Sequence, residues 1–323
     1  MRISLRAFPA TAAPVVVLAA CTAIATYAAT EGHFDRTLRV NGTVNLDVQT
    51  GAGGIEVRQG GSATVEIHGI IRTSADADHR VHYLESHPPI EQNGNTIRIG
   101  HIEDRDLTRN ISISYDLTVP AETELHSASG SGSENIEGIR GPVDASSGSG
   151  TITLRNIGSE VRVRAGSGDI TLNSIHGSAQ ANTGSGSIQA NEIAGGFTGN
   201  AGSGGIHLQQ TAAGDVNIGT GSGSIEISGA VGAVRAHTGS GNLTAQGRPK
   251  GNWNLRTGSG NLEVTFPPQA AYDLVAHAGS GGIHMSQTVS VQGTANKHEL
   301  HGKVHGGGSV VDLSTGSGSI RIN

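Results

Sequence analysis

The stretch GSGTITLRNIGSEVRVRA, residues 148–165, contains the pattern that decides the fold. After the Gly-Ser-Gly triplet, isoleucine and leucine alternate with threonine and arginine; after Gly158, two valines alternate with two arginines. Alternation of apolar and polar residues over short runs is typical of strands that bury one face. Because glycine can take a positive φ without a Cβ clash, we expect the triplet and Gly158 to form the corners between two strands.

The triplet recurs ten times along the chain. Its copies begin at Gly130, Gly148, Gly166, Gly184, Gly202, Gly221, Gly239, Gly258, Gly279 and Gly316. Successive starting positions differ by 18, 18, 18, 18, 19, 18, 19, 21 and 37, and the last interval predicts one degenerate copy near Lys297. A fixed period indicates stacked structural units. Propeller blades need about 40 or more residues, and sandwiches have irregular strand spacing, so the period favours neither.

We therefore predict an all-β fold, a single-stranded β-helix or β-solenoid with coils of about 18 residues. A unit of two short strands cannot bury its apolar edge alone, whereas stacked coils bury it against their neighbours. With a spacing of about 4.8 Å, ten or eleven coils make a rod on the order of 50 Å long. Aromatic residues form only 3% of the chain, which fits a narrow aliphatic interior.

The residues before the first triplet are less regular. GAGGIEV at 51–57 resembles an imperfect copy, but its distance from Gly130 is not a whole number of periods, and residues 75–86 predict a short helix or a loop. Further strands are expected at 64–67, 96–99 and 111–119. We expect residues 36–125 to form a β-rich cap and residues 126–323 to form the solenoid, because an open terminal coil would expose unpaired strand edges.

The N-terminus predicts export. Arg2 and Arg6 precede an apolar run at residues 12–20, which is the arrangement of a signal peptide. The run is shorter than the roughly 20 apolar residues that span a membrane. We therefore expect a protein of the cell envelope rather than one with a membrane-spanning helix.

The end of the apolar run suggests how the chain is anchored. Leu18-Ala19-Ala20-Cys21 matches the lipobox of bacterial lipoproteins, in which the cysteine is acylated and becomes the mature N-terminus. This predicts a signal peptide at 1–20, a linker at 21–35 and, in a Gram-negative cell, an outer-membrane lipoprotein. Ala23-Ile24-Ala25 leaves ordinary signal-peptidase cleavage open as the alternative. Cys21 is the only cysteine, so no intrachain disulfide can form.

The charge balance argues against nucleic acid as a partner. The chain has 21 basic and 27 acidic side chains, a formal net charge of −6. Binding to nucleic acid depends on basic clusters that neutralise phosphates. The sequence contains no such cluster.

The triplets match no catalytic or phosphate-binding motif. A nucleophile elbow has the form G-x-S-x-G with a histidine and an acid nearby, and a phosphate-binding loop needs a lysine. We therefore expect the triplets to be structural turns. The best-framed copies are Gly148-Ser149-Gly150, Gly166-Ser167-Gly168, Gly184-Ser185-Gly186 and Gly221-Ser222-Gly223.

The 15 histidines supply the only metal-site candidates. On a helix, the spacing of His298, His301 and His305 would bring the three rings onto one face, where they could bind zinc or copper. The stretch HGKVHGGG is rich in glycine, which argues against a stable helix. The alternative is a set of solvated surface histidines, and we expect no cofactor.

Several further motifs resemble a known family. YDLTVPA at 115–121, the FPP…YDL segment at 266–274 and the closing GGG…GSGSI segment at 306–320 accompany the GSG-x-[IL]-x-[ILV] repeats. Together they are similar to the "putative adhesin" family of bacterial envelope proteins, a domain of unknown function. The resemblance covers residues 38–323. It implies a β-helix and supplies no catalytic residues.

Taken together, these features predict a non-enzymatic cell-envelope lipoprotein. Its expected role is that of an adhesin or of a surface interaction or structural protein, with envelope glycans or another envelope protein as partner and the membrane reached only through the lipid anchor. One alternative is a glycan-active β-helix enzyme of the lyase or hydrolase type, which would need charged side chains converging in one groove. Another is an envelope assembly or stress factor that adds a partner strand to the edge of the solenoid.

Overall fold

The computed structural model describes residues 30–73, 78–287 and 290–323. These residues form two long sheets and two short helices, α1 (Asp78–Ser86) and α2 (Arg105–Thr108). In spatial order, the 14-stranded sheet contains β1 (Thr30–Arg39), β4 (Thr64–Thr73), β7 (Ile111–Val119), β3 (Ile55–Gln59), β9 (Glu134–Glu137), β11 (Ile152–Ile157), β13 (Ile170–Ile175), β15 (Ile188–Ile193), β17 (Ile206–Gln210), β19 (Ile225–Val231), β21 (Leu243–Arg248), β23 (Leu262–Thr265), β29 (Ile320–Ile322) and β25 (Ile283–Met285).

The 15-stranded sheet runs beside it. In spatial order, it contains β26 (Ser290–Ala295), β27 (Glu299–Val304), β24 (Tyr272–Ala278), β28 (Ser309–Ser317), β22 (Trp253–Ser259), β20 (Val234–Thr238), β18 (Val216–Thr220), β16 (Phe197–Ala201), β14 (Ala179–Thr183), β12 (Val161–Ala165), β10 (Val143–Ser147), β8 (Thr123–Ser129), β2 (Val44–Thr50), β6 (Thr96–Ile99) and β5 (Ile90–Asn93).

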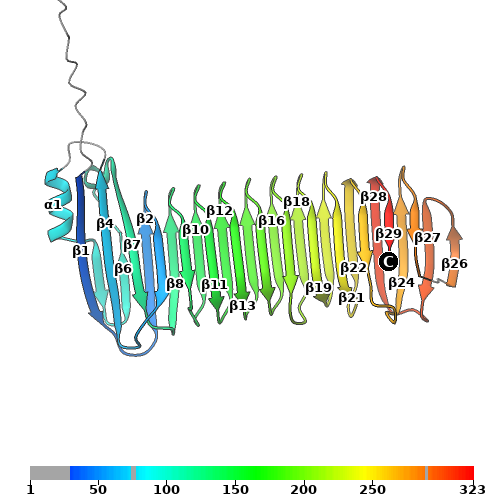
Figure 1. Cartoon of the computed structure of the whole chain (residues 1–323), viewed down its shortest axis with the longest axis horizontal. Coiled ribbons are helices and arrows are strands. Elements are labelled where there is room, and N and C mark those ends of the chain that lie inside the picture. Colours follow the sequence, from blue (N-terminus) through cyan, green and yellow to red (C-terminus); the bar gives the residue numbers. More distant parts are fainter. Residues whose placement is uncertain (1–29, 74–77, 288–289) are drawn as a thin grey trace, which may run out of the picture.

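Each coil contributes one strand to either sheet, and successive coils stack in parallel (Figure 1). The chain passes from β10 through the triplet at Gly148 into β11, and then turns into β12 of the next coil. Ile152 pairs with Ile170, one period later. The described residues contain eleven such two-strand coils, from the coil of β2 and β3 to that of β24 and β25. The predicted all-β solenoid is therefore confirmed, and the period of the sequence is the register of the stack.

The interior is a set of aliphatic ladders. Ile152 and Leu154 are fully buried from one sheet and Val163 from the other, while Arg162 and Arg164 are exposed. Burying each such side chain stabilises the fold by roughly 1.5–3 kcal/mol. Apart from Phe197 in β16, the larger buried rings lie towards the ends of the described stack. Trp253, Phe266 and Tyr272 pack together at the C-terminal end, with adjacent ring centroids 5.1 and 4.8 Å apart.

The triplets require glycine for a different physical reason from the positive φ that was expected. None of them has a positive φ. A Cβ added at Gly166 would instead lie 2.4 Å from the carbonyl oxygen of Gly148, and one at Gly168 would lie 1.9 Å from that of Gly150. Glycine is needed because the corners of neighbouring coils approach too closely for any side chain.

Positive φ values occur at the opposite corner of the coils. Asn156, Ser174 and Glu192 have φ values of 54°, 57° and 57°, each one period from the next, and Gly138 and Gly229 take the same turn. The left-handed conformation costs a residue with a Cβ about 1–2 kcal/mol relative to glycine. This corner of the coils therefore contains strained backbone conformations, which the triplet corner does not.

Both ends of the stack depart from chain order. At the C-terminal end, β28 lies between β22 and β24, and β29 lies between β23 and β25, so the last coil of the chain is inserted between two earlier ones. A Cβ added at Gly279 would meet the carbonyl oxygen of Gly316, so these two triplets are direct neighbours.

The degenerate copy predicted near Lys297 is therefore wrong. The intervening residues form β26 and β27, which pair in antiparallel fashion, and β27 pairs in the same way with β24. This antiparallel pair extends only the 15-stranded sheet, so the extra residues lie beyond the last coil rather than within the stack.

The N-terminal end is built in a similar way. The imperfect copy at 51–57 joins β2 to β3, and this coil lies between β6 and β7 on one side and β8 and β9 on the other. The segment between β3 and β8 in the chain thus contributes strands to the outer side of this coil and none between the two coils, which explains the irregular spacing. The boundary at residue 125 stays a prediction. The strands β2 and β3, which precede it in the chain, already lie in the regular stack.

Helix α1 packs at the N-terminal end through Val81 and Leu84, which are both buried. The helix packs against β1 and β4, and β1, β4 and β7 pair in antiparallel fashion. The backbone N–H of His33, on edge strand β1, donates to the Glu85 carboxylate over 3.0 Å. In the part of the chain that the structure describes, no helix has the length and apolarity to cross a membrane.

Candidate binding surfaces along the solenoid

The predicted turn residues lie at one corner of the rod. The serines at 149, 167, 185 and 222 and the first glycine of each of these triplets are exposed, whereas Gly150, Gly168 and Gly186 are buried and Gly223 is half-buried. The exposed serines of successive coils form a row of hydroxyls along the edge. Among the described residues, nothing beside this row supplies a base or an acid in a position repeated from coil to coil.

The residue before each triplet was missed by the sequence reasoning and has a structural role. Thr183 is buried; its hydroxyl donates to the carbonyl oxygen of Gly168 in the preceding coil over 2.9 Å and accepts from the N–H of Gly186 over 3.2 Å. Thr220 makes the same pair of contacts, at 2.8 and 3.2 Å. The sequence feature that could have revealed this role is the threonine or serine that precedes most triplets. The hydroxyl of this residue links one coil to the next.

A groove of ≈330 Å³ runs across five successive coils. It follows the beginnings of the parallel strands β8, β10, β12, β14 and β16, where the chain enters the 15-stranded sheet. The residue just before the strand is small in two of these coils, Ser178 before β14 and Gly196 before β16, and larger in the others. The lining residues are Glu124, Leu125, His126, Pro142, Val143, Asp144, Glu160, Val161, Arg162, Ser178, Ala179, Gln180, Gly196, Phe197, Thr198 and Asp215.

The polar side chains of the groove come from equivalent positions of the repeat. His126, Asp144, Arg162, Gln180 and Thr198 pair in register, one from each coil, and all point away from the interior. They therefore form a row with the spacing of the strands, about 4.8 Å per step. A partner that crosses the coils meets a different hydrogen-bonding group at each step.

Charge is distributed unevenly in this groove. Arg164 donates to Asp144 over 3.3 Å, and His126 lies 3.6 Å from Glu124. Arg162, by contrast, forms no ion pair within the described residues and is exposed. Four carboxylates line the groove, those of Glu124, Asp144, Glu160 and Asp215. The groove thus offers donors and acceptors together, with one cation free to bind.

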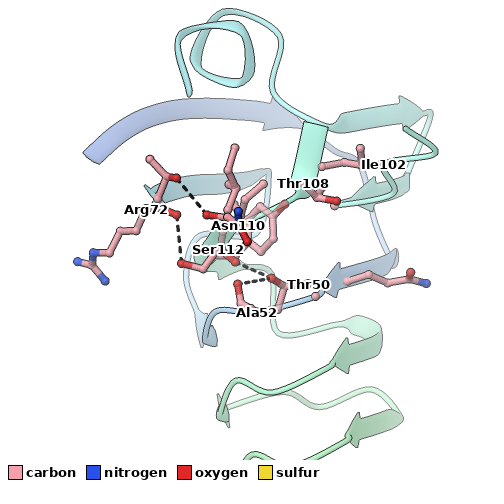
Figure 2. A pocket seen from close by; sticks show the side chains of 14 residues that line it. Thr50, Ala52, Arg72, Ile102, Thr108, Asn110 and Ser112 are labelled. Atoms are coloured by element: carbon pink, nitrogen blue, oxygen red, sulfur yellow. Dashed lines mark hydrogen bonds between the residues drawn. The ribbon is translucent and has the colours of Figure 1, made fainter. Parts of the chain in front are cut away.

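A cavity of ≈700 Å³ lies where the N-terminal cap meets the first coil (Figure 2). Thr50, at the end of β2, donates its hydroxyl to the carbonyl oxygen of Ile113 over 2.6 Å. Thr73 donates to the carbonyl oxygen of Asn110 over 3.0 Å, which fixes the opposite wall. Tyr115 is 2% exposed, and among the described residues its hydroxyl has no hydrogen-bond partner. Burial raises the pKa of this phenol above its ordinary value.

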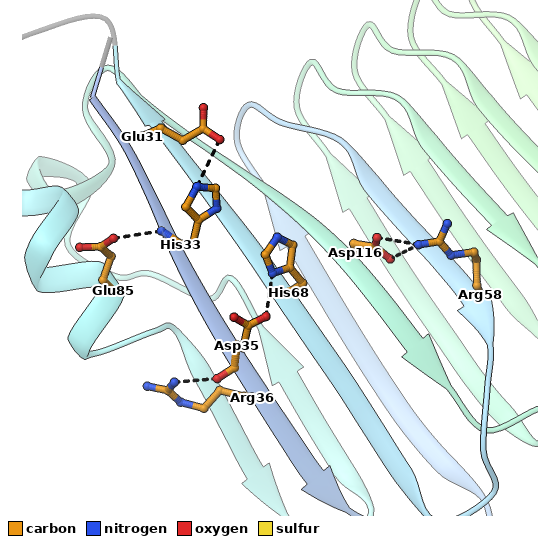
Figure 3. Close-up of polar contacts among 8 residues, drawn as sticks. All are labelled: Glu31, His33, Asp35, Arg36, Arg58, His68, Glu85 and Asp116. Carbon is orange, nitrogen blue, oxygen red and sulfur yellow. Dashed lines mark hydrogen bonds and ion pairs between the residues drawn. The ribbon is translucent and has the colours of Figure 1, made fainter. Parts of the chain in front are cut away.

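Charged side chains gather on the outer face of the cap strands (Figure 3). Arg58 binds Asp116 through one guanidinium nitrogen, 2.7 and 2.6 Å from the two carboxylate oxygens, and this hydrogen bond raises the pKa of Arg58. His68 lies 2.7 Å from Asp35 and stacks on His33, with ring centroids 5.8 Å apart.

Most charges of this cap face have a partner on the same face. His33 lies 3.3 Å from Glu31 (Figure 3). Hydrogen bonds from His82 and from the backbone of His33 lower the pKa of Glu85. The face therefore serves the pairing of cap strands and helix, and it leaves few charges free for a ligand.

One carboxyl group lies inside the solenoid. Glu134 is 1% exposed and occupies the ladder position that Ile55 and Ile152 hold in the coils on either side. Burial raises the pKa of Glu134 to about 7, although a hydrogen bond from the Ser127 hydroxyl acts in the opposite direction. The second carboxyl oxygen, Oε1, has no partner in the described part of the chain.

The three candidate histidines do not share a helix. His301 is on strand β27, beside Glu299 at 3.4 Å, while His298 lies in the turn before that strand. His305 follows the strand, and its ring nitrogen lies 3.0 Å from the carbonyl oxygen of Ala270. Among the described residues, no group of three or more His, Cys, Asp or Glu side chains is placed to hold a metal ion.

The predicted acylation site, Cys21, lies outside the described residues. The signal peptide at 1–20 also lies outside them, and the linker at 21–35 is described only from residue 30. The lipid anchor therefore stays a prediction from the sequence.

Comparisons with known proteins give a family and two similar structures. The family model described as Toastrack DUF4097 matches residues 43–323. A search of curated proteins gave no match. A "putative cell adhesion protein" from Clostridium sporogenes ATCC 15579 is 14% identical with a TM-score of 0.23, over 91% of this chain and 99% of that one. A "putative adhesin" from Bacteroides fragilis NCTC 9343 is 14% identical with a TM-score of 0.28, over 90% and 97%. These values are too low to indicate a shared function.

Proposed function

Because this chain belongs to the Toastrack DUF4097 family, whose description names no activity, we propose from its surface that it is a non-enzymatic binding protein of the cell envelope. Its partner is an extended envelope component, an envelope glycan in the first place, that lies across the coils. The observation that carries the proposal is the groove built from equivalent positions of five successive coils.

The chemistry of the groove suits a polyhydroxylated chain. Gln180 and Thr198 can both donate and accept, and carboxylates accept from hydroxyl groups. Arg162 adds a donor that no carboxylate of the described residues occupies. The parallel stack holds these groups at a fixed spacing, so little conformational entropy is lost on binding. Many weak contacts spread over several coils give specificity for a linear partner.

The proposed location follows from the sequence. Export through the signal peptide and acylation of Cys21 place the rod on a membrane surface with its grooves in the envelope. A bacterial lipoprotein carries more than one acyl chain, and two or more chains are needed for stable anchoring. Labelling with a radioactive fatty acid tests this: the wild type takes up label and Cys21→Ala does not. An unlabelled wild type contradicts it.

Binding itself is tested by capture on immobilised envelope glycans. We expect the full-length chain to be retained, and the double variant Arg162→Ala, Gln180→Ala to be retained at least tenfold less. Arg235→Ala, which removes an outward arginine of the same sheet from outside the groove, serves as the matched control. Equal retention of all three proteins contradicts the proposal.

A second candidate function is cleavage of a glycan. The observation that favours it is that four carboxylates line the groove, since glycosidases use a pair of carboxyl groups. Release of new reducing ends from an envelope polysaccharide, lost in Glu160→Gln and Asp144→Asn, would establish this activity. Retention of the polysaccharide at constant chain length would favour the binding protein.

A further inference from the structure

A second groove lies farther along the same rod, where the repeat becomes irregular. It has a volume of ≈520 Å³ and follows the ends of β17, β19, β21 and β23 in the 14-stranded sheet. Two of the intervals between triplets in this region are one residue longer than the regular period. The extra residues shift the register, for example between Ile227 and Ala230 where β19 pairs with β21. Such irregularities open a sheet locally and are common at binding sites.

A buried amide without its full set of partners lies in this groove. Gln210 is 4% exposed and pairs with Ile193 after a register shift between β15 and β17, so a polar side chain replaces an aliphatic one in the ladder. Its Nε2 donates to the carbonyl oxygens of Gly195 and Gly214 over 2.8 and 3.2 Å. Its Oε1 is buried and has no hydrogen-bond partner among the described residues. A buried polar atom without a partner is destabilising by about 1–3 kcal/mol, so such an atom beside a groove points to a bound donor.

The rim of the groove is cationic and its wall is apolar. Arg248 lines both this groove and an adjoining cavity of ≈360 Å³, to which Lys250 also contributes. Both side chains are exposed, and neither forms an ion pair within the described residues. Phe266, Pro267 and Pro268 form the apolar wall. Two exposed cations therefore lie close together beside the apolar wall.

We propose that this groove binds an acidic oligosaccharide, with a uronic-acid carboxylate on Arg248 and Lys250. A sugar hydroxyl donates to Gln210 Oε1, and the C–H face of a ring packs on the wall formed by Phe266 and the prolines. Arginine binds carboxylates through paired donors, which gives such a contact its geometry. The wall is rigid because proline fixes φ. This inference rests on the proposed glycan-binding function and assigns to it a second site with a defined charge preference.

The test is a titration of the full-length chain with tetragalacturonate and with neutral cellotetraose, followed by calorimetry at low salt. We expect tetragalacturonate to bind at least tenfold more tightly. The double variant Arg248→Ala, Lys250→Ala should lower that affinity at least tenfold and leave cellotetraose binding unchanged. The charge-matched control Arg235→Ala, Lys297→Ala removes two exposed cations elsewhere and should bind like the wild type.

A second variant separates the site from the general charge of the surface. Gln210→Met keeps the volume of the side chain and all cations but removes Oε1, so we expect it to lower tetragalacturonate affinity several-fold while its circular dichroism stays unchanged. Equal losses in the control pair and in the Arg248 pair overturn the proposal. So does hexaglutamate that binds as tightly as tetragalacturonate, since the groove would then accept an acidic protein segment.

The failure of this inference differs from the failure of the proposed function. If tetragalacturonate binding is lost in Arg162→Ala but kept in the Arg248 pair, the second site is refuted and the five-coil groove stands. If neither groove variant changes the retention of any envelope glycan, the proposed function itself fails.

Discussion

Replacing Glu134 should change how the stability of the protein depends on pH. The group is buried in an aliphatic ladder and its pKa is about 7, against an ordinary value of 4.5. The folded protein therefore keeps the proton up to about pH 7, whereas the unfolded chain releases it near pH 4.5. The stability that this group contributes is full below pH 4.5 and is lost as the pH rises through 7.

The magnitude follows from the size of the pKa shift. One pKa unit corresponds to about 1.4 kcal/mol, so this shift amounts to about 3 kcal/mol of unfolding free energy between acidic and mildly alkaline pH. Glu134→Gln is neutral at every pH and should lack this component. In Glu134→Ile with Ser127→Ala, the ladder becomes continuous with Ile55 and Ile152, and the serine hydroxyl is not left unpaired.

The assay is urea unfolding followed by circular dichroism at pH 5 and pH 8, with hydrogen exchange of the β9 amides as a local measurement. The difference between wild type and Glu134→Gln isolates the carboxyl group from all other titrating groups. We expect the wild type to lose about 2.5 kcal/mol relative to the variant on going from pH 5 to pH 8, because the unfolded chain has already released most of this proton at pH 5. The reasoning is refuted if both proteins change stability by the same amount.

Four further substitutions test the corners of the coils by urea unfolding. Gly166→Ala places a Cβ 2.4 Å from the carbonyl oxygen of Gly148 in the preceding coil and should destabilise the fold by roughly 1–3 kcal/mol. Gly51→Ala, at the same corner with nothing within 4 Å, should be neutral or stabilising. Equal effects of the two substitutions would refute the close approach. Thr183→Val removes a hydroxyl that bonds two coils and should destabilise by roughly 1–3 kcal/mol; an unchanged midpoint would refute this role. Glu192→Asn, at φ 57°, should be stabilising by a few tenths to about 1 kcal/mol, and a loss of stability would show that the bond from Ser174 outweighs the strain.

The sequence pattern predicted the fold because the interior is periodic. Ile152, Leu154 and Val163 are buried as their alternation with polar residues indicates. The reason for the glycines could not be read in the same way, since a positive φ and a close approach between coils both require glycine. The position of the last coil, inserted between two earlier ones, could not be predicted from the sequence either. The long interval between Gly279 and Gly316 fits a missing copy of the triplet as well as a terminal antiparallel pair of strands.

The candidate sites were less visible in the sequence than the fold. The groove across five coils is lined by residues about 18 positions apart in the sequence, which come together only when the coils are stacked. Glu134 had a signal, since aligning the copies places it in a column of isoleucines. Gln210 had none, because it reaches its ladder position beside Ile193 only through a register shift. The lengthened intervals between triplets marked the region of the second groove but not its chemistry.

The most direct test of the central claim is the capture of the full-length protein on immobilised envelope glycans, with the chain length of the glycan measured before and after. The account predicts retention of the wild type, at least tenfold weaker retention of Arg162→Ala with Gln180→Ala, and glycan of unchanged length. Equal retention of both proteins, or progressive shortening of the glycan by the wild type, would contradict it.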